Sequence, residues 1–511
     1  MATAQIAAVL LPLPLPEAFD YRIPDDLVLA PGDHVRVPLG PRDVRGVVIR
    51  VRALADEDRD RRLKPVRAKV EDPPLPAESL AFLDWVARWT LAPPGQVLLG
   101  MLAGLRAKPP KPEPRLQLGP LFLRGLEGLK RTPARNRVLA VLVDSGERAS
   151  WRPGDLAEQS GVSAAVIKGL VDEGVLVRTT CLPSADWPQP DPDHPRTPLN
   201  DTQSAALGQL LEPIKANRFQ VSLLDGVTGS GKTEVYLEAV AAVLRQDPAA
   251  QILVLLPEIA LTEAVLDRIT HRFGSAPAAW HSGLSPARRR AVWEGVADGQ
   301  VRIVIGARSA LFLPFNRLRL IVVDEEHDGS YKQEEGLRYQ ARDLAVVRAR
   351  LSGASLILAS ATPSLESLWN AEQGRYAWVR LTQRHGVARL PDIQLIDLRQ
   401  DPPERGRWLS PPLVRALGET WSRGEQSLLF LNRRGYAPLV LCTACGERMT
   451  APDTDSWLVE HRYTGQLVCH LTGFSMPKPE RCPHCGAKDS LTSIGPGVER
   501  VEEEVRERFP D

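Results

Sequence analysis

The sequence predicts a multi-domain α/β protein organised around a nucleotide-binding lobe. The first observation is the run GVTGSGKTEVY at Gly226–Tyr236, which fits the phosphate-loop pattern G-x-x-x-x-G-K-[ST] and lies between an apolar run and a helix-forming run. The second is the alternation of short aliphatic runs with helical patterns from Leu199 onward, which is typical of a parallel sheet covered by helices. The third is a pair of C-x-x-C motifs far along the chain, which predicts a separate metal-binding segment.

The composition is that of an ordinary globular protein, with 43% hydrophobic and 25% charged residues over 511 positions. The net charge of +1 means that any nucleic-acid surface must be local. The chain lacks an apolar run of about 18 residues and a basic leader, so we expect neither a membrane span nor a signal peptide. Four of the six cysteines lie in C-x-x-C pairs, which excludes a secreted disulfide scaffold and suits a metal site in a reducing cytoplasm.

Residues 1–105 predict a β-rich N-terminal domain. Short apolar strands at Ile6–Leu11, His34–Val37 and Gly46–Val51 are separated by proline and glycine turns, as in a small barrel-like module. Residues 73–105 follow a helical pattern. The residues expected on one face of these helices are Leu80, Phe82, Leu83, Val86 and Trp89.

Residues 117–180 predict a winged helix, after a linker rich in lysine and proline. Three short helical patterns precede a strand-like run at Val175–Arg178, and Gly161 separates the second pattern from the third. Such a module most often contacts DNA, and a protein-contact or spacer domain is the alternative. Residues 181–198 are a proline-rich linker.

Residues 199–385 predict a P-loop lobe that binds ATP and Mg²⁺. The glycines of the loop allow backbone N–H groups to surround the phosphates, and the following helix adds positive potential. Lys232 is expected to reach the β- and γ-phosphates, and Thr233 to bind Mg²⁺. The remaining loop positions assigned to the nucleotide are Gly226, Gly229, Ser230 and Gly231.

A second half of the nucleotide site is predicted by the run LIVVDEEH, an apolar strand that ends in carboxylates. Asp324 is expected to hold Mg²⁺ through water, and Glu325 to orient the attacking water. Gln203 lies just before the first strand of the lobe, and its amide can pair with the adenine edge. An ordinary surface glutamine is the alternative interpretation.

Residues 386–441 predict the start of a second α/β lobe near Ser410, with a strand at Ser427–Leu431. A zinc-binding segment at residues 442–486 interrupts this lobe, and residues 487–511 continue it. Two C-x-x-C knuckles supply four thiolates for a closed, tetrahedral, structural Zn²⁺ site, with free thiols as the alternative. The predicted ligands are Cys442, Cys445, Cys482 and Cys485.

Long motifs in a fixed order carry a family resemblance. They are GVTGSGKTEVYL, LLPEIALT, HSGLS, VIGARSALFLPF, DEEHDGSYKQEEGLRYQARDLAVVRA, SATPSLES and LFLNRRGYAP, together with FDYRIP and RVPLG nearer the N-terminus. On these motifs the chain resembles, over essentially its whole length, the bacterial PriA family (primosomal protein N′), which are superfamily-2 replication restart helicases. A transcription regulator with an attached ATPase is a third class of function, and these motifs argue against it.

The resemblance implies an activity and partners. PriA proteins recognise abandoned replication forks, hydrolyse ATP, move 3′ to 5′ on single-stranded DNA and recruit proteins that reload the replicative helicase. The expected partners are therefore forked and single-stranded DNA with its 3′ end, primosome proteins and single-stranded-DNA-binding protein. The expected location is the cytoplasm, at the nucleoid.

The resemblance also implies two sets of DNA-binding residues. A pocket for the DNA 3′ end falls on Phe19, Asp20, Gly40 and Lys64, although Phe19 alone would be read as a core residue. An aromatic-rich loop falls on Asp328–Arg342, for which a purely structural role is the alternative. The loop residues expected to stack on bases or contact phosphates are Tyr331, Lys332, Arg338 and Tyr339.

The chain departs from the family in two ways. PriA proteins carry two nested zinc sites, whereas here Ala451, Thr454 and Thr472 leave Cys469 as one cysteine of four in the inner site. His461 and His470 lie nearby but leave the ligand set short, so we predict one zinc ion.

The second departure concerns the second helicase lobe. The family's Q-V-A-G-R-A-G-R motif and its C-terminal DNA-binding domain do not occur in these 511 residues. The motif's arginine completes the ATP site, so we expect nucleotide binding with slow hydrolysis and no unwinding. The alternative to a restart helicase is therefore a non-motor scaffold that binds forks and recruits primosome proteins.

Overall fold

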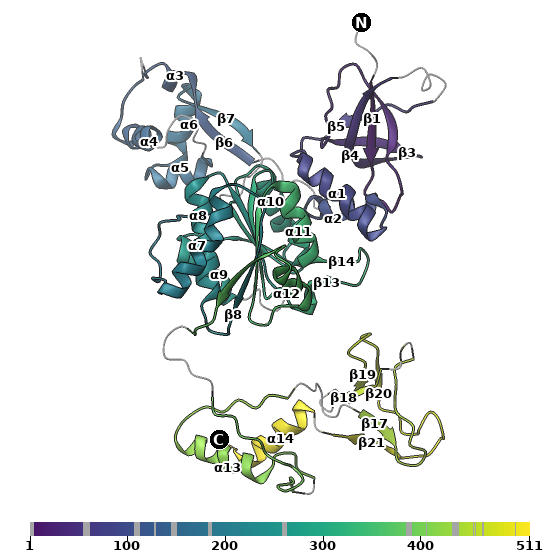
Figure 1. Cartoon of the computed structure of the whole chain (residues 1–511). Helices are drawn as coiled ribbons and strands as arrows, with labels where there is room; N and C mark the ends of the chain where they lie inside the picture. Colours follow the sequence, from purple (N-terminus) through teal and green to yellow (C-terminus); the bar gives the residue numbers. More distant parts are fainter. Residues whose placement is uncertain are drawn as a thin grey trace. The chain divides into compact units, whose positions relative to one another are not determined.

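The computed structural model shows two compact units, Met1–Arg389 and Leu390–Asp511, which are described separately (Figure 1). Within the described residues, no helix combines the length and apolar character needed to cross a membrane. The structure describes all residues except 1–4, 55–61, 107–112, 127–128, 145–150, 182–186, 258–262, 385–390, 405, 432–438, 453, 455, 462–463, 496 and 511.

The N-terminal module is a five-stranded antiparallel sheet in the order β2-β1-β4-β3-β5, which confirms the predicted β-rich domain. The segment between β4 and β5 joins the two sides of this sheet. The backbone N–H of Arg22 donates to the Lys64 carbonyl at 3.0 Å, and that of Arg67 donates to the Arg36 carbonyl at 2.9 Å. These bonds curl the sheet toward a barrel. The strands are β1 (Gln5–Leu10), β2 (Phe19–Ile23), β3 (His34–Leu39), β4 (Arg42–Ala53) and β5 (Ala68–Lys69).

Helices α1 (Ala77–Thr90) and α2 (Pro94–Met101) and the 3₁₀ turn η2 (Ala103–Arg106) follow this sheet. The expected apolar face of α1 is buried at Phe82, Leu83 and Val86. Trp89 is a correction, because its side chain is 72% exposed. It lies in the last turn of α1 and stacks on Trp85 one turn earlier, with ring centroids 5.2 Å apart, instead of entering the core.

The N-terminal helices share one hydrophobic core with the nucleotide lobe. Trp293 of the lobe is fully buried, and its indole N–H donates to the Met101 carbonyl at 2.7 Å. A side chain at Gly104 would overlap the Trp293 ring, so this position requires glycine. The buried guanidinium of Arg348 donates to the Ser79 hydroxyl at 3.0 Å. The N-terminal module and the lobe are therefore packed together as one body.

The region from β6 (Glu113–Leu118) to β7 (Leu176–Cys181) forms a two-stranded antiparallel ribbon with helices between the strands. These helices and the ribbon enclose their own small hydrophobic core. Gly161 takes a φ of +60° between the last two helices. The helices are α3 (Pro120–Leu123), α4 (Pro133–Asp144), α5 (Pro153–Gln159) and α6 (Ala164–Asp172).

The nucleotide lobe is a seven-stranded parallel sheet in the order β10-β11-β9-β12-β15-β8-β16. Helices cover both faces, with α7, α8 and α9 on one face and α10, α11 and α12 on the other (Figure 1). The strands are β8 (Val221–Gly226), β9 (Gln251–Leu255), β10 (Ala278–Trp280), β11 (Ile303–Gly306), β12 (Leu318–Asp324), β15 (Ser355–Ser360) and β16 (Ala377–Leu381). The helices are α7 (Asp201–Lys215), α8 (Lys232–Gln246), α9 (Glu263–Phe273), α10 (Pro286–Ala297), α11 (Ala341–Ser352) and α12 (Leu365–Glu372).

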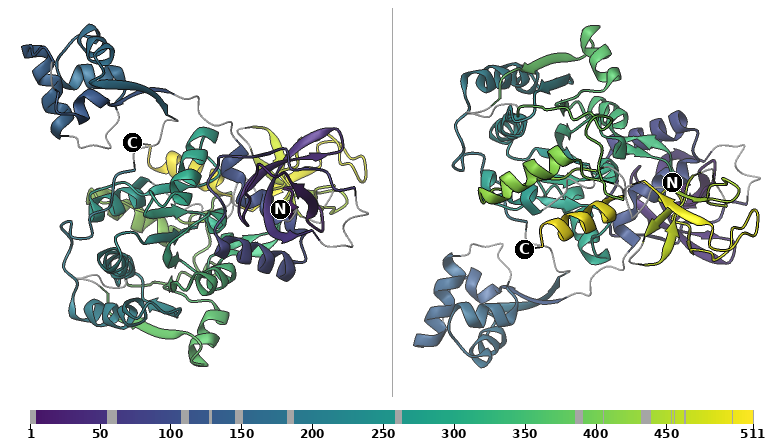
Figure 2. Two further views of the ribbon diagram at one scale, coloured as in Figure 1. Left: turned by 90° about the horizontal axis from the view of Figure 1, so that it is seen from above. Right: turned by 90° about the horizontal axis from the view of Figure 1, so that it is seen from below.

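Among its described residues, the second unit has helices α13 and α14, drawn in green and yellow in Figure 2, and two small antiparallel sheets, one of β17 with β21 and one of β18, β19 and β20. The predicted strand Ser427–Leu431 is wrong, because these residues have no regular secondary structure and no ladder partner, and Leu428 and Phe430 are 90% and 85% exposed. A strand needs a neighbouring strand, and none lies beside this segment among the described residues. The elements are α13 (Pro411–Ser422), β17 (Leu439–Cys442), β18 (Val459–His461), β19 (Gln466–Val468), β20 (Ser475–Pro477), β21 (Leu491–Ile494) and α14 (Val498–Arg508).

Candidate nucleotide, metal and DNA sites

The candidate nucleotide site lies at the carboxyl ends of β8, β12 and β15, where ligands bind in open α/β sheets. A cleft of about 380 Å³ opens there. The phosphate-loop and carboxylate residues that line it are Gly229, Gly231, Lys232, Thr233, Asp324 and Glu325. The sequence-predicted loop and carboxylates are thus brought to one cleft.

The conformation of the phosphate loop depends on its glycines and on a hydrogen bond from Lys232. Gly229 and Gly231 have φ of +76° and +81°, a region that favours glycine, and Gly231 caps the N-terminus of α8. A Cβ at Gly226 would lie 2.7 Å from the Ser230 hydroxyl oxygen, so this glycine is also sterically required. The Lys232 ammonium donates to the Gly226 carbonyl at 2.8 Å. The lysine is therefore folded back onto the loop that it is predicted to serve.

Gln203 lines the same cleft and is bonded to the protein around it. Its side chain is 2% exposed, and its amide N–H donates to the Ser230 carbonyl at 2.9 Å. Its amide oxygen accepts from the Asn200 backbone N–H at 3.0 Å, which completes a capping box at the start of α7. Both ends of the amide are thus paired with the protein, and Gln203 ties α7 to the phosphate loop. Its pairing with adenine stays a prediction.

Asp324 is a partly buried carboxylate at the end of β12. One of its oxygens accepts from the Tyr236 hydroxyl at 2.9 Å, and the other accepts from the Glu325 backbone N–H at 3.0 Å. Burial raises the pKa of Asp324 above its usual value of 3.8, since the charged form loses hydration. Glu325 has a φ of +46°, an uncommon conformation for a non-glycine residue. Oxygen donors from Asp324 and Thr233 in one cleft are the ligand type that Mg²⁺ prefers.

Glu326, which the sequence analysis did not single out, is fully buried behind these carboxylates. It accepts hydrogen bonds from the Ser364 backbone N–H at 2.6 Å and from the Ser367 hydroxyl at 2.9 Å, and it pairs with Arg342 at 3.3 Å. Nearby, His327 Nδ1 lies 2.7 Å from the Ser360 hydroxyl. The DEEH run is therefore bonded to the segment after β15 and to the end of the aromatic-rich loop. The spacing of Glu326, its two serine partners and Arg342 along the sequence matches no known motif, so the sequence alone does not identify this buried cluster.

The aromatic-rich loop contains η5 (Gly329–Tyr331), β13 (Lys332–Gln333) and β14 (Tyr339–Gln340). Tyr331 is a correction to the stacking prediction, because it is 1% exposed and its hydroxyl donates to the Asp324 carbonyl at 2.6 Å. Tyr339 is half-buried and packs edge-on against Phe312 of η4 (Arg308–Phe312), and burial raises the pKa of its phenol to about 12. Lys332 and Arg338 are exposed beside an open hollow of about 690 Å³.

The predicted 3′-end residues gather at one side of the N-terminal sheet. Phe19 begins β2 with its side chain 39% exposed, as a stacking role requires. The Asp20 carboxylate accepts from Arg52 at 3.1 Å. The Lys64 carbonyl is bonded to β2, as described above, and Gly40 has a φ of +61° in the turn after β3. The Tyr21 hydroxyl donates to the carbonyl of Pro38 at 3.1 Å, which draws that turn toward β2.

The four predicted zinc ligands form one cluster, with all four Sγ atoms within 4.8 Å of one another. Among the described residues it is the one group of three or more candidate metal ligands. The Cys442–Cys485 and Cys445–Cys482 Sγ distances are 3.7 Å and 3.8 Å. A tetrahedral ion with Zn–S bonds of about 2.3 Å requires sulfur atoms about 3.8 Å apart, so the cluster fits zinc.

The two knuckles have the same backbone hydrogen bonds. The backbone N–H of Gly446 donates to the Cys442 carbonyl at 2.8 Å, and that of Gly486 donates to the Cys482 carbonyl at 2.9 Å. Both glycines have positive φ, as this turn requires. Hydrogen bonding by the Ser490 hydroxyl and by knuckle amides lowers the pKa of Cys442 to about 6, whereas at Cys445 a knuckle amide is outweighed by desolvation and the three neighbouring thiols, which raise the pKa of this thiol to about 12. The thiolate form is therefore favoured at Cys442.

Cys469 lies outside this cluster. It is 1% exposed and belongs to a small core that includes Ala451, Leu458 and Leu467. Its backbone N–H donates to the Phe474 carbonyl at 2.8 Å, and the Gly473 N–H donates to its carbonyl at 2.8 Å, which repeats the geometry of the two knuckles. The prediction of one zinc ion per chain stays a prediction.

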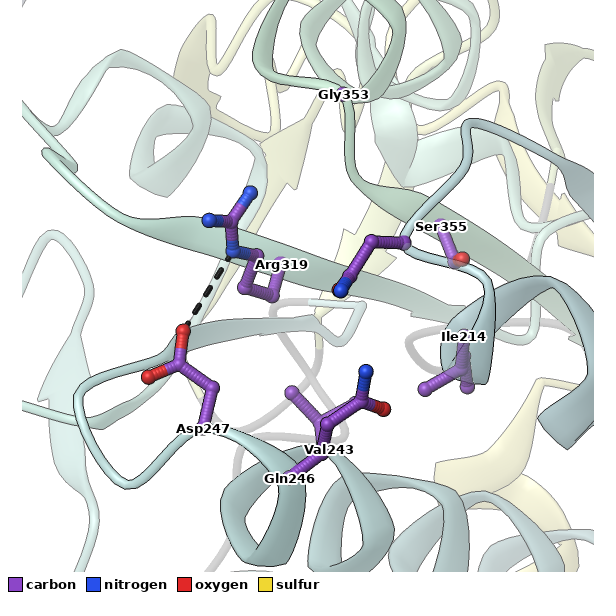
Figure 3. A pocket seen from close by; sticks show the side chains of 8 residues that line it. Ile214, Val243, Gln246, Asp247, Arg319, Gly353 and Ser355 are labelled. Atoms are coloured by element: carbon purple, nitrogen blue, oxygen red, sulfur yellow. Dashed lines mark ion pairs between the residues drawn. The ribbon is translucent and has the colours of Figure 1, made fainter.

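A second hollow in the nucleotide lobe lies at the opposite ends of the parallel strands, near the first residues of β12 and β15 (Figure 3). Its lining includes Arg319, whose guanidinium pairs with Asp247 at 3.6 Å, and Ser355. Its interior space is about 10 Å³, which is room for about one water molecule. The nucleotide cleft, at the carboxyl ends of the strands, is therefore the larger of these two hollows.

Comparisons with known proteins agree with this arrangement. Residues 8–103 match the family described as the 3'DNA-binding domain (3'BD) of PriA, and residues 200–370 match the DEAD/DEAH box helicase family. The replication restart protein PriA of Rickettsia felis is 35% identical over 99% of this chain and 66% of its own length. PriA of Bacillus subtilis is 34% identical over 96% of this chain, and PriA of Haemophilus influenzae is 36% identical over 99% of it, and each is covered over 69% of its own length. The chain spans about two thirds of the length of these relatives, and it belongs to the PriA family of replication restart proteins.

Proposed function

We propose that this chain acts in replication restart as a member of the ATP-dependent 3′-to-5′ helicase and translocase family, and that it binds abandoned forks and initiates primosome assembly. The observation that carries the proposal is the joining of two matched domains in one packed body. The 3′-end-binding module and the nucleotide lobe share a hydrophobic core through Trp293 and Arg348. Forked DNA, primosome proteins and single-stranded-DNA-binding protein are the proposed partners, and the cytoplasm at the nucleoid is the proposed location.

At the nucleotide site, we assign Lys232 to the β- and γ-phosphates and Thr233 to Mg²⁺. Asp324 holds the metal's water shell, and Glu325 orients the attacking water. When bound, Mg²⁺ would supply positive charge that neutralises the phosphates and the partly buried Asp324 carboxylate. The glycine loop donates backbone N–H groups to phosphate oxygens. Support comes from the gathering of these residues in one cleft.

At the DNA sites, we assign the exposed Phe19 ring to the terminal base and Asp20 to the 3′ hydroxyl. Lys64 meets a phosphate, and Gly40 allows a close approach of the backbone. On the aromatic-rich loop, Lys332 and Arg338 contact phosphates, and the half-buried Tyr339 offers one ring edge.

The domain organisation is proposed from the same reasoning. Residues 1–105 bind the 3′ end, and residues 117–180 form a winged helix that contacts DNA, a proposal supported by helices α3 to α6 and the two-stranded ribbon. Residues 181–198 link this module to the first helicase lobe at residues 199–385. Residues 386–441 and 487–511 belong to a second lobe, into which the segment 442–486 is inserted around one structural Zn²⁺ ion.

The decisive experiment measures ATP turnover by the 511-residue chain with and without forked DNA. We expect DNA to stimulate turnover, and Lys232→Ala to reduce it about 10²–10³-fold, as for other lost charge-stabilising contacts. Lys215→Ala, on the exposed end of α7, is the matched control and should leave turnover unchanged. If wild type and Lys232→Ala turn over equally while fork binding persists, the protein is a non-motor scaffold and the proposal fails.

The fork-binding half is tested by comparing forks that end in a 3′ hydroxyl or a 3′ phosphate. We expect wild type to prefer the hydroxyl end, and Asp20→Asn and Phe19→Ala to lose this preference. Equal affinity of wild type for both ends would contradict the assigned pocket without affecting the nucleotide site.

A further inference from the structure

Two histidines of the second unit face each other at close range. His461 ends β18, and His470 follows β19, its antiparallel neighbour. Their Nε2 atoms are 3.0 Å apart, and their rings meet edge-on at an angle of 71°. This separation admits a shared proton, and it also admits a shared metal ion.

The distance fits two ligands of one metal. Metal–imidazole bonds of about 2.0–2.1 Å place two nitrogen ligands about 2.9 Å apart at right angles and about 3.4 Å apart at the tetrahedral angle. The observed 3.0 Å lies within this interval. Both rings reach solvent, since the His461 side chain is 23% exposed and His470 is exposed. An ion can therefore enter, and water can complete its coordination.

The other nitrogen of His461 has the partner that metal-binding histidines usually have. Its Nδ1 lies 3.0 Å from a carboxylate oxygen of Glu499, in the first turn of α14. If Nδ1 carries the proton and donates it to Glu499, the lone pair of Nε2 points toward His470. A carboxylate behind a histidine fixes its tautomer and raises its basicity as a ligand.

We propose that His461 and His470 bind one divalent transition-metal ion that prefers imidazole and completes its coordination with water, Ni²⁺ or Cu²⁺, through their Nε2 atoms. Glu499 acts as a positioning residue behind His461. The site is separate from the four-thiolate cluster, whose members are all cysteines. Because Glu499 belongs to α14, a bound ion would also fasten the β18–β19 hairpin to that helix.

The test uses the zinc-loaded chain, freed of any histidine tag, titrated with Ni²⁺ by calorimetry while its zinc content is monitored. We expect one further equivalent of Ni²⁺ to bind without loss of zinc. His461→Asn and His470→Asn should each abolish this binding. Glu499→Gln should keep the stoichiometry and weaken affinity about 10–100-fold, as for other residues behind metal ligands. His271→Asn, on the exposed surface of α9, is the matched control and should bind as wild type does.

A second measurement does not depend on how the variants fold. Cu²⁺ added at one equivalent to the zinc-loaded wild type should give an electron paramagnetic resonance spectrum with coupling to two nitrogen atoms. Absence of the further equivalent, unchanged binding in a folded His461→Asn variant, or a Cu²⁺ spectrum without two nitrogens would overturn the proposal. Unchanged affinity in Glu499→Gln would overturn the role of Glu499.

Discussion

The nucleotide lobe and the cysteine segment obtain order from different sources. In the lobe, every residue of β9 and β15 is buried, and helices cover both faces of seven strands. In residues 439–494, five short strands are divided between two sheets, and the hydrophobic core has six buried members. Apolar burial is sufficient for the first region. The hydrophobic core of the cysteine segment is too small to hold the segment folded by apolar burial alone. We therefore expect a bound metal to cross-link the segment and supply the missing stability.

Removing the metal should give the largest effect. Structural zinc in small domains contributes about 10–16 kcal/mol of apparent binding free energy, which is also folding free energy. A thiol-reactive mercurial that releases zinc should therefore unfold residues 439–494 and leave the nucleotide lobe intact. Amide hydrogen exchange, measured segment by segment before and after release, checks this.

Two cysteine variants serve as a matched pair for the same comparison. Cys442→Ser removes a cluster thiolate and should lose zinc, whereas Cys469→Ser removes a buried thiol outside the cluster and should retain it. If the cysteine segment kept its protection after zinc had left, the contrast between the two regions would be wrong.

Within the body that contains the lobe, a single large side chain should have a smaller but substantial effect. Trp293→Ala leaves a cavity at the junction with the N-terminal module and should lower the free energy of unfolding by about 3–5 kcal/mol. Trp89→Ala is the control, because this ring is 72% exposed, and it should cost less than about 0.5 kcal/mol. Thermal unfolding of both variants provides the measurement, and equal losses would refute the shared core.

The smallest effect on stability should come from replacing Asp324, the partly buried carboxylate of the nucleotide lobe. Because burial raises the pKa of Asp324, the folded state binds its proton more tightly than the unfolded chain does. The charged carboxylate therefore costs stability as the pH rises above 3.8, and this cost is absent at lower pH. Asp324→Asn should stabilise the metal-free protein by about 0.5–1 kcal/mol at neutral pH and abolish ATP turnover.

Chemical denaturation of Asp324→Asn and wild type at several pH values checks the sign of this effect. The gain should shrink as the pH falls toward the ordinary pKa of an aspartate. A gain that stays constant with pH, or a loss of stability at neutral pH, would show that the hydrogen bonds from Tyr236 and Glu325 outweigh desolvation.

Much of the fold could be predicted because its signals are local. The aliphatic runs at β9, β11, β12 and β15 are short and continuous, as buried parallel strands are. The glycine spacing of the phosphate loop likewise predicts a strand before the loop and a helix after it. The cysteine spacing similarly identified all four members of the cluster.

The errors arose where a residue's role depends on distant partners. The residue type of Tyr331 predicts stacking on a base, but its ring is buried and its hydroxyl donates to the Asp324 carbonyl. Glu326 was missed because its serine partners lie on the far side of β15 in sequence. The composition of Ser427–Leu431 is typical of a strand, but no described strand lies beside this segment to form a sheet with it.

The closed phosphate loop makes nucleotide capture an exchange of partners. A ligand that takes both the Gln203 amide and the Lys232 ammonium must first displace the Ser230 and Gly226 carbonyls. Each displaced hydrogen bond is worth about 0.5–1.5 kcal/mol, so together they weaken apparent affinity by about 5–150-fold relative to an open loop. These internal hydrogen bonds therefore compete with the nucleotide, and a segment that held Gln203 or Lys232 away from those carbonyls would raise nucleotide affinity without contacting the nucleotide.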